Sequence, residues 1–420
     1  MILLKNGTFI DWNSLQFLRK DILVKDGLDE NIIFDPTPED SIGAVTLDCQ
    51  GNFITKSFAC GHHHVYSALA RGMPAPRKNP ENFNEILEYI WWNLDKALDL
   101  DMIRSSALAT ALACARNGIT FVIDHHASPN AVLGSLDTIA KAFDQVGVGH
   151  LLCYEITDRD GMTKAEQGLA ETESYLGNNQ GLIGLHASFT VGYETLRKAV
   201  NLAERTKSGI HVHVAEATSD QEHCIANYGM RVIERFAEAG ALQFPNTILG
   251  HCLHLNDHER GLVAGSPAWV VQNMESNLNN SVGFFNSKGL GNRIMLGTDG
   301  MHSDMLRSAK SAFFAGHNFD LIDYMESYRR FRNVHNYLST NNYMGDGANN
   351  LVVMDYNSPT PLNTNNFLGH FLFGLESQQV KHVISSGKLI VKDTVAQNVN
   401  EQEILQEARN QAVRLWEKMK

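Results

Sequence analysis

Eight short apolar runs alternate with longer amphipathic stretches through the middle of this 420-residue chain. The amphipathic stretches, such as SSALATALACARNG and LRKAVNLAERTKSG, carry apolar residues at helical spacing and end in glycine. Alternating strands and helices are typical of a parallel sheet, and eight repeats predict an α/β protein built on a (β/α)8 barrel. The apolar runs are FITKSFACGHH, GITFVIDHH, GVGHLLCYEI, GLIGLHAS, GIHVHVAE, NTILGHC, AWVVQN and NRIMLGTD.

An open, doubly wound sheet is the competing fold. That fold carries a glycine-rich phosphate-binding loop after its first strand. No GxGxxG motif follows the first apolar run, and the chain has no GxxxxGK motif followed by Ser or Thr. The sequence therefore favours the barrel.

The two ends of the chain differ from the middle. Residues 1–50 and 351–393 consist of short strand-like segments separated by Gly, Asn and Asp turns, which predicts a small β-domain made from both ends. The expected division is a β-domain of residues 1–55 plus 348–400, a barrel domain of residues 56–347, and a C-terminal helix of residues 401–420.

Composition restricts the function classes. The formal net charge of −12 argues against a general binder of nucleic acid or anionic membranes, because such proteins need basic surface. The six cysteines are scattered without a CxxC pair, which indicates reduced thiols. We expect no signal peptide, because the first residues, MILLKNGTFIDW, have no long apolar region and no small-residue cleavage site. No window has the roughly 18 apolar residues of a membrane span. We expect a cytoplasmic protein that binds neither nucleic acid nor membrane, and homo-oligomerisation stays open.

Histidine and aspartate gather where the apolar runs end. The carboxyl ends of barrel strands carry the catalytic groups, and six of the eight runs place histidine or aspartate there. One buried histidine is usually a satisfied core residue, but an imidazole in apolar surroundings needs a partner, so the joint placement indicates a site. Because side chains alternate along a strand, His62 and His64 share one face and His63 takes the other.

His62, His64, His213 and Asp299 can form a site of three imidazoles and one carboxylate. Such a donor set suits one divalent transition metal, and we expect Zn²⁺ in preference to Fe²⁺ or Mn²⁺. A metal with an open position lowers the pKa of its bound water to about 7.

Three further roles follow from this placement. Glu216 lies three residues after His213, where it can serve as the proton shuttle. Asp299 can take the proton of the attacking water, and His251 can hydrogen-bond that water or polarise the substrate. The catalytic candidates are therefore Glu216, His251 and Asp299.

These motifs resemble those of the amidohydrolase superfamily, which has HxH on strand one, HxxE after strand five, His on strand six and TDG on strand eight. The stretches CGHHHVYSALARGM, YIWWNLDKALD, LHASFTVG and ESNLNNSVGF resemble its mononuclear aminohydrolase and chlorohydrolase branch, near members associated with selenium metabolism. The resemblance covers nearly the whole chain. It implies a distorted TIM barrel with a small β-sandwich from both chain ends, and one metal, because no lysine ends the fourth run.

The resemblance also assigns residues. It implies that His186 and Asn277 lie near the substrate. It also implies the metal ligands and the proton-transfer groups that are named above. Two departures stand out: Lys56-Ser57 replaces the usual Pro-Gly before the first strand, and QNMESN at 272–277 replaces HNPxSN. The second departure changes the charge and shape of the pocket, so the substrate cannot be transferred by analogy.

Several other residues have two interpretations. His302 either contacts the substrate or lies in a solvated loop, and Trp92, with Trp91, forms either an aromatic lid or a helix packed on the barrel. His125 and His126 are adjacent, so at most one should face the barrel mouth. We expect His63 and His211 to serve in packing or in support of the ligands.

The leading functional hypothesis is a metal-dependent hydrolase of carbon–nitrogen bonds other than peptide bonds. It would replace an amino or similar leaving group on a nitrogen heterocycle or amidine-like carbon with hydroxide, so its partner is a small molecule. Hydrolysis of a cyclic amide, with the metal polarising the carbonyl, is an alternative on the same site. A non-catalytic metal-binding partner in a selenium-related pathway is the other alternative, against which Glu216 and Asp299 argue.

Overall fold

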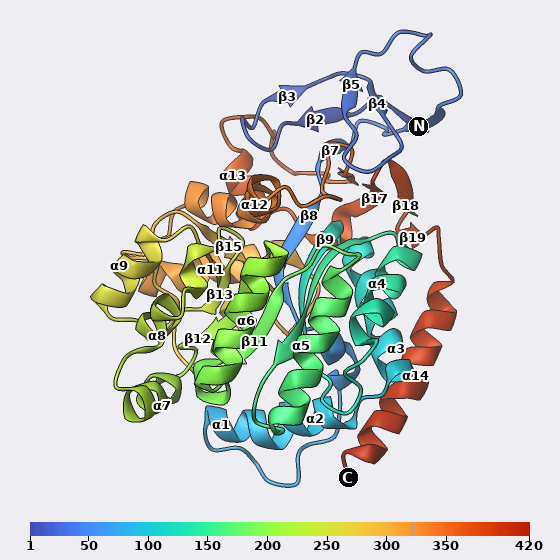
Figure 1. Ribbon diagram of the computed structural model, residues 1–420. Helices are drawn as coiled ribbons and strands as arrows, with labels where there is room; N and C mark the ends of the chain where they lie inside the picture. Colours follow the sequence, from blue (N-terminus) through green and yellow to red (C-terminus); the bar gives the residue numbers. More distant parts are fainter. Residues whose placement is uncertain (321) are drawn as a thin grey trace.

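The computed structural model describes residues 1–320 and 322–420. A parallel eight-stranded barrel lies at its centre with helices around it, and strands from both chain ends lie at one end of the barrel (Figure 1). A parallel bridge between His63 and Asp299 joins the first barrel strand to the segment after the last. Each predicted run contains one barrel strand, which confirms the fold class. The strands are β8 (Phe58–His63), β9 (Ile119–His126), β10 (Gly149–Ile156), β11 (Ile183–Ala187), β12 (Ile210–Val214), β13 (Ile248–His251), β14 (Trp269–Gln272) and β15 (Ile294–Leu296).

Side chains of the barrel strands alternate between the barrel interior and the surrounding helices. In β9, Phe121 and Ile123 belong to the interior core, whereas Val122 packs in the larger cluster outside. All eight residues of β9 are buried, which explains its continuous apolar run. Apolar residues fill the interior around the earlier part of each strand, so the inward-facing residues at the strand ends remain available for a polar site.

The remaining strands form two sheets. The four-stranded sheet has the order β5-β4-β1-β6, and the seven-stranded sheet has the order β19-β18-β17-β16-β7-β2-β3, so both chain ends contribute as expected. The first apolar run contains two strands instead of one, because β7 joins the seven-stranded sheet and β8 joins the barrel. The strands are β1 (Ile2–Lys5), β2 (Thr8–Ile10), β3 (Phe17–Leu18), β4 (Ile22–Val24), β5 (Ile32–Phe34), β6 (Val45–Asp48), β7 (Phe53–Lys56), β16 (Leu351–Met354), β17 (Val380–Ser385), β18 (Lys388–Lys392) and β19 (Val395–Ala396).

Helices cover the outside of the barrel, and α14 runs along α3 (Figure 1). Asp99 begins α3 by accepting a hydrogen bond from the backbone N–H of Met102, as expected for an N-cap. No helix in the described part of the chain is both long and apolar enough to cross a membrane. The longer helices are α3 (Leu100–Arg116), α4 (Ser135–Val146), α5 (Met162–Leu176), α6 (Tyr193–Thr206), α7 (Thr218–Tyr228), α8 (Val232–Glu238), α9 (Asp257–Gly265), α11 (Met305–Phe319), α12 (Tyr324–Thr340), α13 (Phe367–Phe373) and α14 (Glu401–Lys418).

Several short helices follow the first barrel strand. The segment between β8 and α3 contains η1 (Val65–Ala70), α1 (Phe83–Ile86), the π-helical turn η2 (Leu87–Trp91) and α2 (Trp92–Ala97). A π-helical turn is rare and is frequently found at functional sites. The other short helices are η3 (Ser188–Thr190), η4 (Ala241–Gln243), α10 (Met274–Asn279) and η5 (Ser377–Gln379).

A buried ion pair stabilises the segment that leads into the first barrel strand. Lys56 Nζ lies 2.8 Å from Asp346 Oδ1, and both side chains are 6% exposed. His335 Nδ1 lies 2.7 Å from Asp346 Oδ2. Burial opposes ionisation of Asp346, but His335 and Lys56 lower its pKa to about 2.

We expect Asp346→Asn to lower the free energy of unfolding at pH 7 by about 3–5 kcal/mol, because it leaves Lys56 buried without its counter-ion. The carboxylate stabilises the fold above its unfolded pKa of about 3.9, and this contribution is lost as the pH falls toward 2. The difference in free energy of unfolding between the wild-type protein and the variant should therefore shrink between about pH 4 and pH 2 in urea titrations. A difference that stays constant over this range would contradict the proposed role of the Asp346 carboxylate.

Candidate metal centre

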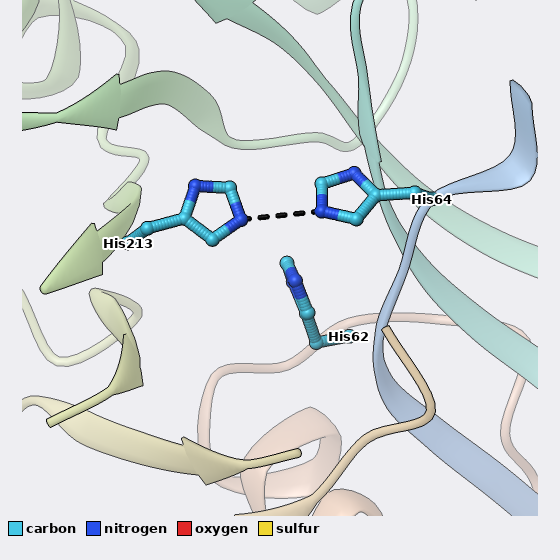
Figure 2. A group of neighbouring side chains, drawn as sticks. All are labelled: His62, His64 and His213. Atoms are coloured by element: carbon cyan, nitrogen blue, oxygen red, sulfur yellow. Dashed lines mark hydrogen bonds between the residues drawn. The ribbon is translucent and has the colours of Figure 1, made fainter. Parts of the chain in front are cut away.

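Three imidazoles and a carboxylate converge at the carboxyl ends of the barrel strands. His64 Nε2 lies 3.2 Å from His213 Nε2 and 3.1 Å from Asp299 Oδ1, and His62 Nε2 lies 3.7 Å from the same oxygen. Figure 2 shows the three rings, with His62 from β8 and His64, directly after that strand, facing His213 from β12. All four residues are buried. The structure thus brings together the four residues that the sequence predicts as one donor set.

The three consecutive histidines at the end of the first strand point in different directions, as expected. The register of β8 against β9 shifts between Cys60 and His63, and His63 turns away from the other two rings. Its Nε2 lies 3.0 Å from Ser303 Oγ, on the outer side of the barrel wall.

We expect His63→Ala to retain about one metal per chain and to lose at most about 1–3 kcal/mol of stability, because only packing and one hydrogen bond disappear. Metal analysis and thermal melting, run beside His62→Ala, test this. Loss of metal as complete as in His62→Ala would contradict the orientation of His63.

Hydrogen bonds at the far ring nitrogens fix the orientation of the three imidazoles. His64 Nδ1 lies 2.6 Å from the carbonyl of His125, and His213 Nδ1 lies 2.8 Å from the carbonyl of His186. A carbonyl only accepts, so both Nδ1 atoms carry a proton. Burial lowers the pKa of His213 well below its usual range, so its Nε2 offers a lone pair. Burial opposes protonation of His64, but its contact with Asp299 raises its pKa to about 9, so a metal at this position would displace the proton on its Nε2. His62 Nδ1 is paired with His211 Nε2 at 2.9 Å, which gives His211 its supporting role.

The converging atoms fit a divalent cation. His64 Nε2 lies 3.2 Å from His213 Nε2, where a divalent cation can take the place of the proton that the two nitrogens share, and His62 Nε2 has no hydrogen-bond partner among the described residues. Burial lowers the pKa of His62 to about 3, which keeps it in the neutral form that binds metals. Supporting hydrogen bonds of this kind are usual behind metal-binding imidazoles. Neutral nitrogen with one carboxylate is a donor set for Zn²⁺.

The pKa values of two carboxyl groups beside these rings are shifted in opposite directions. Burial and the charge of Asp299 raise the pKa of Glu216 to about 8. Burial opposes ionisation of Asp299, but its contacts with His62 and His64 hold its pKa well below the usual range. A protonated and an ionised carboxyl group side by side can divide the work of acid and base.

His251 lies between these two carboxyl groups. Its Nε2 is 3.6 Å from Glu216 Oε2 and 3.7 Å from Asp299 Oδ2. Asn277 Nδ2 lies 2.7 Å from His251 Nδ1, and an amide N–H donates, so Nδ1 accepts and the ring proton is on Nε2. His251 is thereby prepared to donate a hydrogen bond into the site.

The backbone is strained at the same strand ends. Asp299 has φ 53°, His251 has φ 65°, and Ala215, which precedes Glu216, has φ 44°. Left-handed backbone at residues other than glycine costs of order 1–3 kcal/mol and clusters at functional sites. These backbone conformations bring the side chains of Asp299, His251 and Glu216 close to one another.

A cavity of about 60 Å³ opens onto the metal-facing atoms. His186 and Trp92 line it, as proposed from the sequence, together with Trp91, Phe83 and Leu87 from the segment between β8 and α3. This volume holds only a few waters. The wall formed by α1, η2 and α2 is partly exposed.

Two proposed substrate neighbours lie elsewhere. Asn277 is fully buried behind His251 and does not line the cavity. His302 Nε2 lies 3.1 Å from Glu275 Oε2, and His302 lines a separate cavity between the barrel and α14. The geometry therefore gives Asn277 a supporting position and gives no support to substrate contact by His302.

The two histidines at the end of β9 point in different directions. His125 lies against Glu155, with Nδ1 3.3 Å from Oε2, and its ring is 4.6 Å from that of His213. His126 turns the other way, toward Ser128, with Nε2 2.9 Å from Oγ. His125 is the member of the pair that faces the barrel interior, below the cavity.

Three charged lining residues were missed by the sequence analysis: Asp95, Glu155 and Arg159. Glu155 stands near the end of the third apolar run, so its place at a strand end was a usable signal. Asp95 lies on α2, where no periodic pattern distinguishes it, and Arg159 lies in the loop after β10. Burial opposes ionisation of Glu155, but His186, His125 and Arg159 hold its pKa well below the usual range.

Known proteins resemble this chain in sequence and in fold. A model described as the amidohydrolase family matches residues 53–390. A 5-methylthioadenosine/S-adenosylhomocysteine deaminase of Syntrophomonas wolfei is 24% identical over 99% of both chains. A 5'-deoxyadenosine deaminase of Methanopyrus kandleri is 27% identical over 77% of this chain and 78% of its own. The crystal structure of an adenosine deaminase from Xanthomonas campestris with bound zinc has a TM-score of 0.83 at 19% identity, covering 99% of this chain and 98% of that one.

Proposed function

The chain belongs to the amidohydrolase family, and from this premise we propose that it is a zinc-dependent deaminase of an aromatic heterocyclic amine. Metal-dependent hydrolysis of a carbon–nitrogen bond is the activity that this site fits. The observation that carries the proposal is the joint arrangement of three imidazole Nε2 atoms, ionised Asp299 and protonated Glu216 beside one cavity. A binding module would need no such pair of carboxyl groups.

His62, His64, His213 and Asp299 would hold the metal, which when bound supplies a water that ionises near neutral pH. The other steps belong to the chain's own residues. Asp299 accepts the proton of the attacking water, Glu216 delivers a proton to the ring nitrogen next to the reacting carbon, and His251 orients the water through Nε2–H. The amino group then leaves as ammonia after a further proton transfer, and the ring retains the oxygen.

The substrate class is inferred from the cavity and the relatives. Aromatic side chains of Trp91, Trp92 and Phe83 form one wall, which suits a flat heterocycle. Relatives named as deaminases of 5-methylthioadenosine, S-adenosylhomocysteine and 5'-deoxyadenosine favour an adenosine-type amine. The sequence motifs also resemble the selenium-associated aminohydrolase SsnA, and we propose that assignment as the finer subgroup.

A panel of amines tests the function. Metal-quantified protein is incubated with adenosines, amino-purines, amino-pyrimidines, pterins and amino-triazines, and ammonia and product mass are measured. We expect ammonia in equal amount to a product one mass unit heavier than the substrate, as amine is replaced by hydroxyl. Ring opening of cyclic amides without ammonia would instead support the lactam alternative. A protein that binds metal but converts nothing would contradict the enzymatic proposal.

A further inference from the structure

A buried carboxylate that takes no part in the proposed chemistry lies directly behind Glu216. Asp220 is in the first turn of α7, four residues after Glu216, and is 3% exposed. Its Oδ2 accepts a hydrogen bond from the backbone N–H of Ala215 at 2.9 Å, and its Oδ1 accepts one from the backbone N–H of Phe189 at 3.1 Å. Each oxygen of the Asp220 carboxylate therefore binds one backbone donor.

These two hydrogen bonds differ from ordinary helix capping. In a capping box, the side chain at the third helical position accepts a hydrogen bond from the backbone N–H of the N-cap residue. The N-cap of α7 is Ala217, but Asp220 accepts from Ala215, which precedes Glu216. The other hydrogen bond reaches Phe189 in η3, which follows the neighbouring strand β11. Asp220 thus connects the segment that carries Glu216 to the loop after β11.

The backbone that Asp220 holds has a strained conformation. Ala215 has φ 44°, in the left-handed region that is unfavourable for a residue with a Cβ atom. Its carbonyl accepts a hydrogen bond from the backbone N–H of His254 at 3.1 Å, so Ala215 is held through both its N–H and its carbonyl. Ala215 is fully buried, and a buried N–H without an acceptor is costly. The carboxylate of Asp220 therefore stabilises the conformation from which the Glu216 side chain projects.

We propose that Asp220 is a positioning residue for the proton shuttle: by holding Ala215 in the left-handed conformation, it directs the carboxyl group of Glu216 toward His251. The inference rests on the proposed function, in which Glu216 delivers a proton to the ring of the substrate. The metal ligand His213 lies within β12, before the strained residue, so the metal site does not depend on this hydrogen bond.

Asp220→Asn tests the proposal in two backgrounds. The amide keeps one acceptor oxygen, and its NH2 group faces the other backbone N–H, so the side chain cannot bind both donors. We expect the kcat for ammonia release to fall about 10- to 100-fold with the metal retained, because a displacement of about 1 Å can cost about 100-fold. In the Glu216→Gln background, the same change should lower kcat less than about threefold, because the group that Asp220 positions is already absent.

Glu171→Gln is the matched control. Glu171 is also buried and accepts two backbone N–H groups, from Gly134 at 2.8 Å and Leu136 at 3.0 Å, but it lies on α5 and connects that helix to the start of α4. This variant should lose stability in the same way and keep the wild-type kcat. The proposal is overturned by an Asp220→Asn protein with wild-type kcat, by loss of its metal, or by an equal loss of kcat in both backgrounds.

Crystal structures provide a readout that does not depend on turnover. In zinc-loaded Asp220→Asn, we expect Ala215 to leave the left-handed region and the carboxyl group of Glu216 to move away from His251. An unchanged φ at Ala215 with Glu216 in its original place overturns the proposal, even if the wild-type protein converts no amine and the proposed function fails. If Asp220→Asn does not fold, Asp220→Glu replaces it in every comparison, because it keeps the charge but displaces both oxygens by one methylene.

Discussion

Replacing Glu216 by glutamine is expected to leave the fold and the metal in place and to lower kcat by about 10²–10⁴-fold. The amide has nearly the same shape as the carboxyl group but cannot deliver a proton. Glu216 is buried beside Asp299, and its raised pKa keeps it protonated near neutral pH, so it is the group in the cavity suited to this delivery. The measurement is steady-state ammonia release with metal content determined on the same preparation.

Glu222→Gln is the matched control, because Glu222 lies exposed on α7 a few residues later. That variant should keep the wild-type kcat and metal content. A Glu216→Gln protein with wild-type kcat would show that the proton comes from another group, with His251 as the next candidate.

Replacing His64 by alanine is expected to strip the metal and abolish turnover. The imidazole supplies one of the three nitrogen donors, and even loss of a supporting hydrogen bond weakens metal affinity about 10–100-fold, so loss of a direct ligand should cost more. Elemental analysis after dialysis should find metal close to background, and ammonia release should fall with it. His63→Ala, the neighbour that faces Ser303, provides the control with retained metal. A His64→Ala protein that holds a full equivalent of metal would remove His64 from the donor set.

The fold and the shared location of the four donors could be predicted because they depend on patterns that sequence displays directly. Eight apolar runs separated by amphipathic stretches specify the barrel, and barrel strands deliver their last residues to one end. His62, His64, His213 and Asp299 all stand at such ends, so their convergence follows from topology. Strand alternation likewise separates His63 from its neighbours.

Other features of the site and the fold could not be predicted, because they depend on contacts between elements that are far apart in the sequence. Asp95 comes from a short helix, and its contact with Arg159 arises only when α2 folds over the barrel mouth. His302 follows TDG and could have faced the cavity, but its pairing with Glu275 takes it to the other side of the loop. The division of the first apolar run into β7 and β8 reflects the packing of two sheets against the barrel, which the continuous hydrophobicity concealed.

The dependence of turnover on one bound metal tests the account most directly. Metal content and ammonia release are measured on one preparation as isolated, after removal of metal by a chelator, and after return of Zn²⁺ in increments. The account predicts that activity disappears with the metal and is restored in proportion to Zn²⁺ up to one equivalent per chain. Full activity in metal-free protein, or activity that needs a second equivalent, would contradict it.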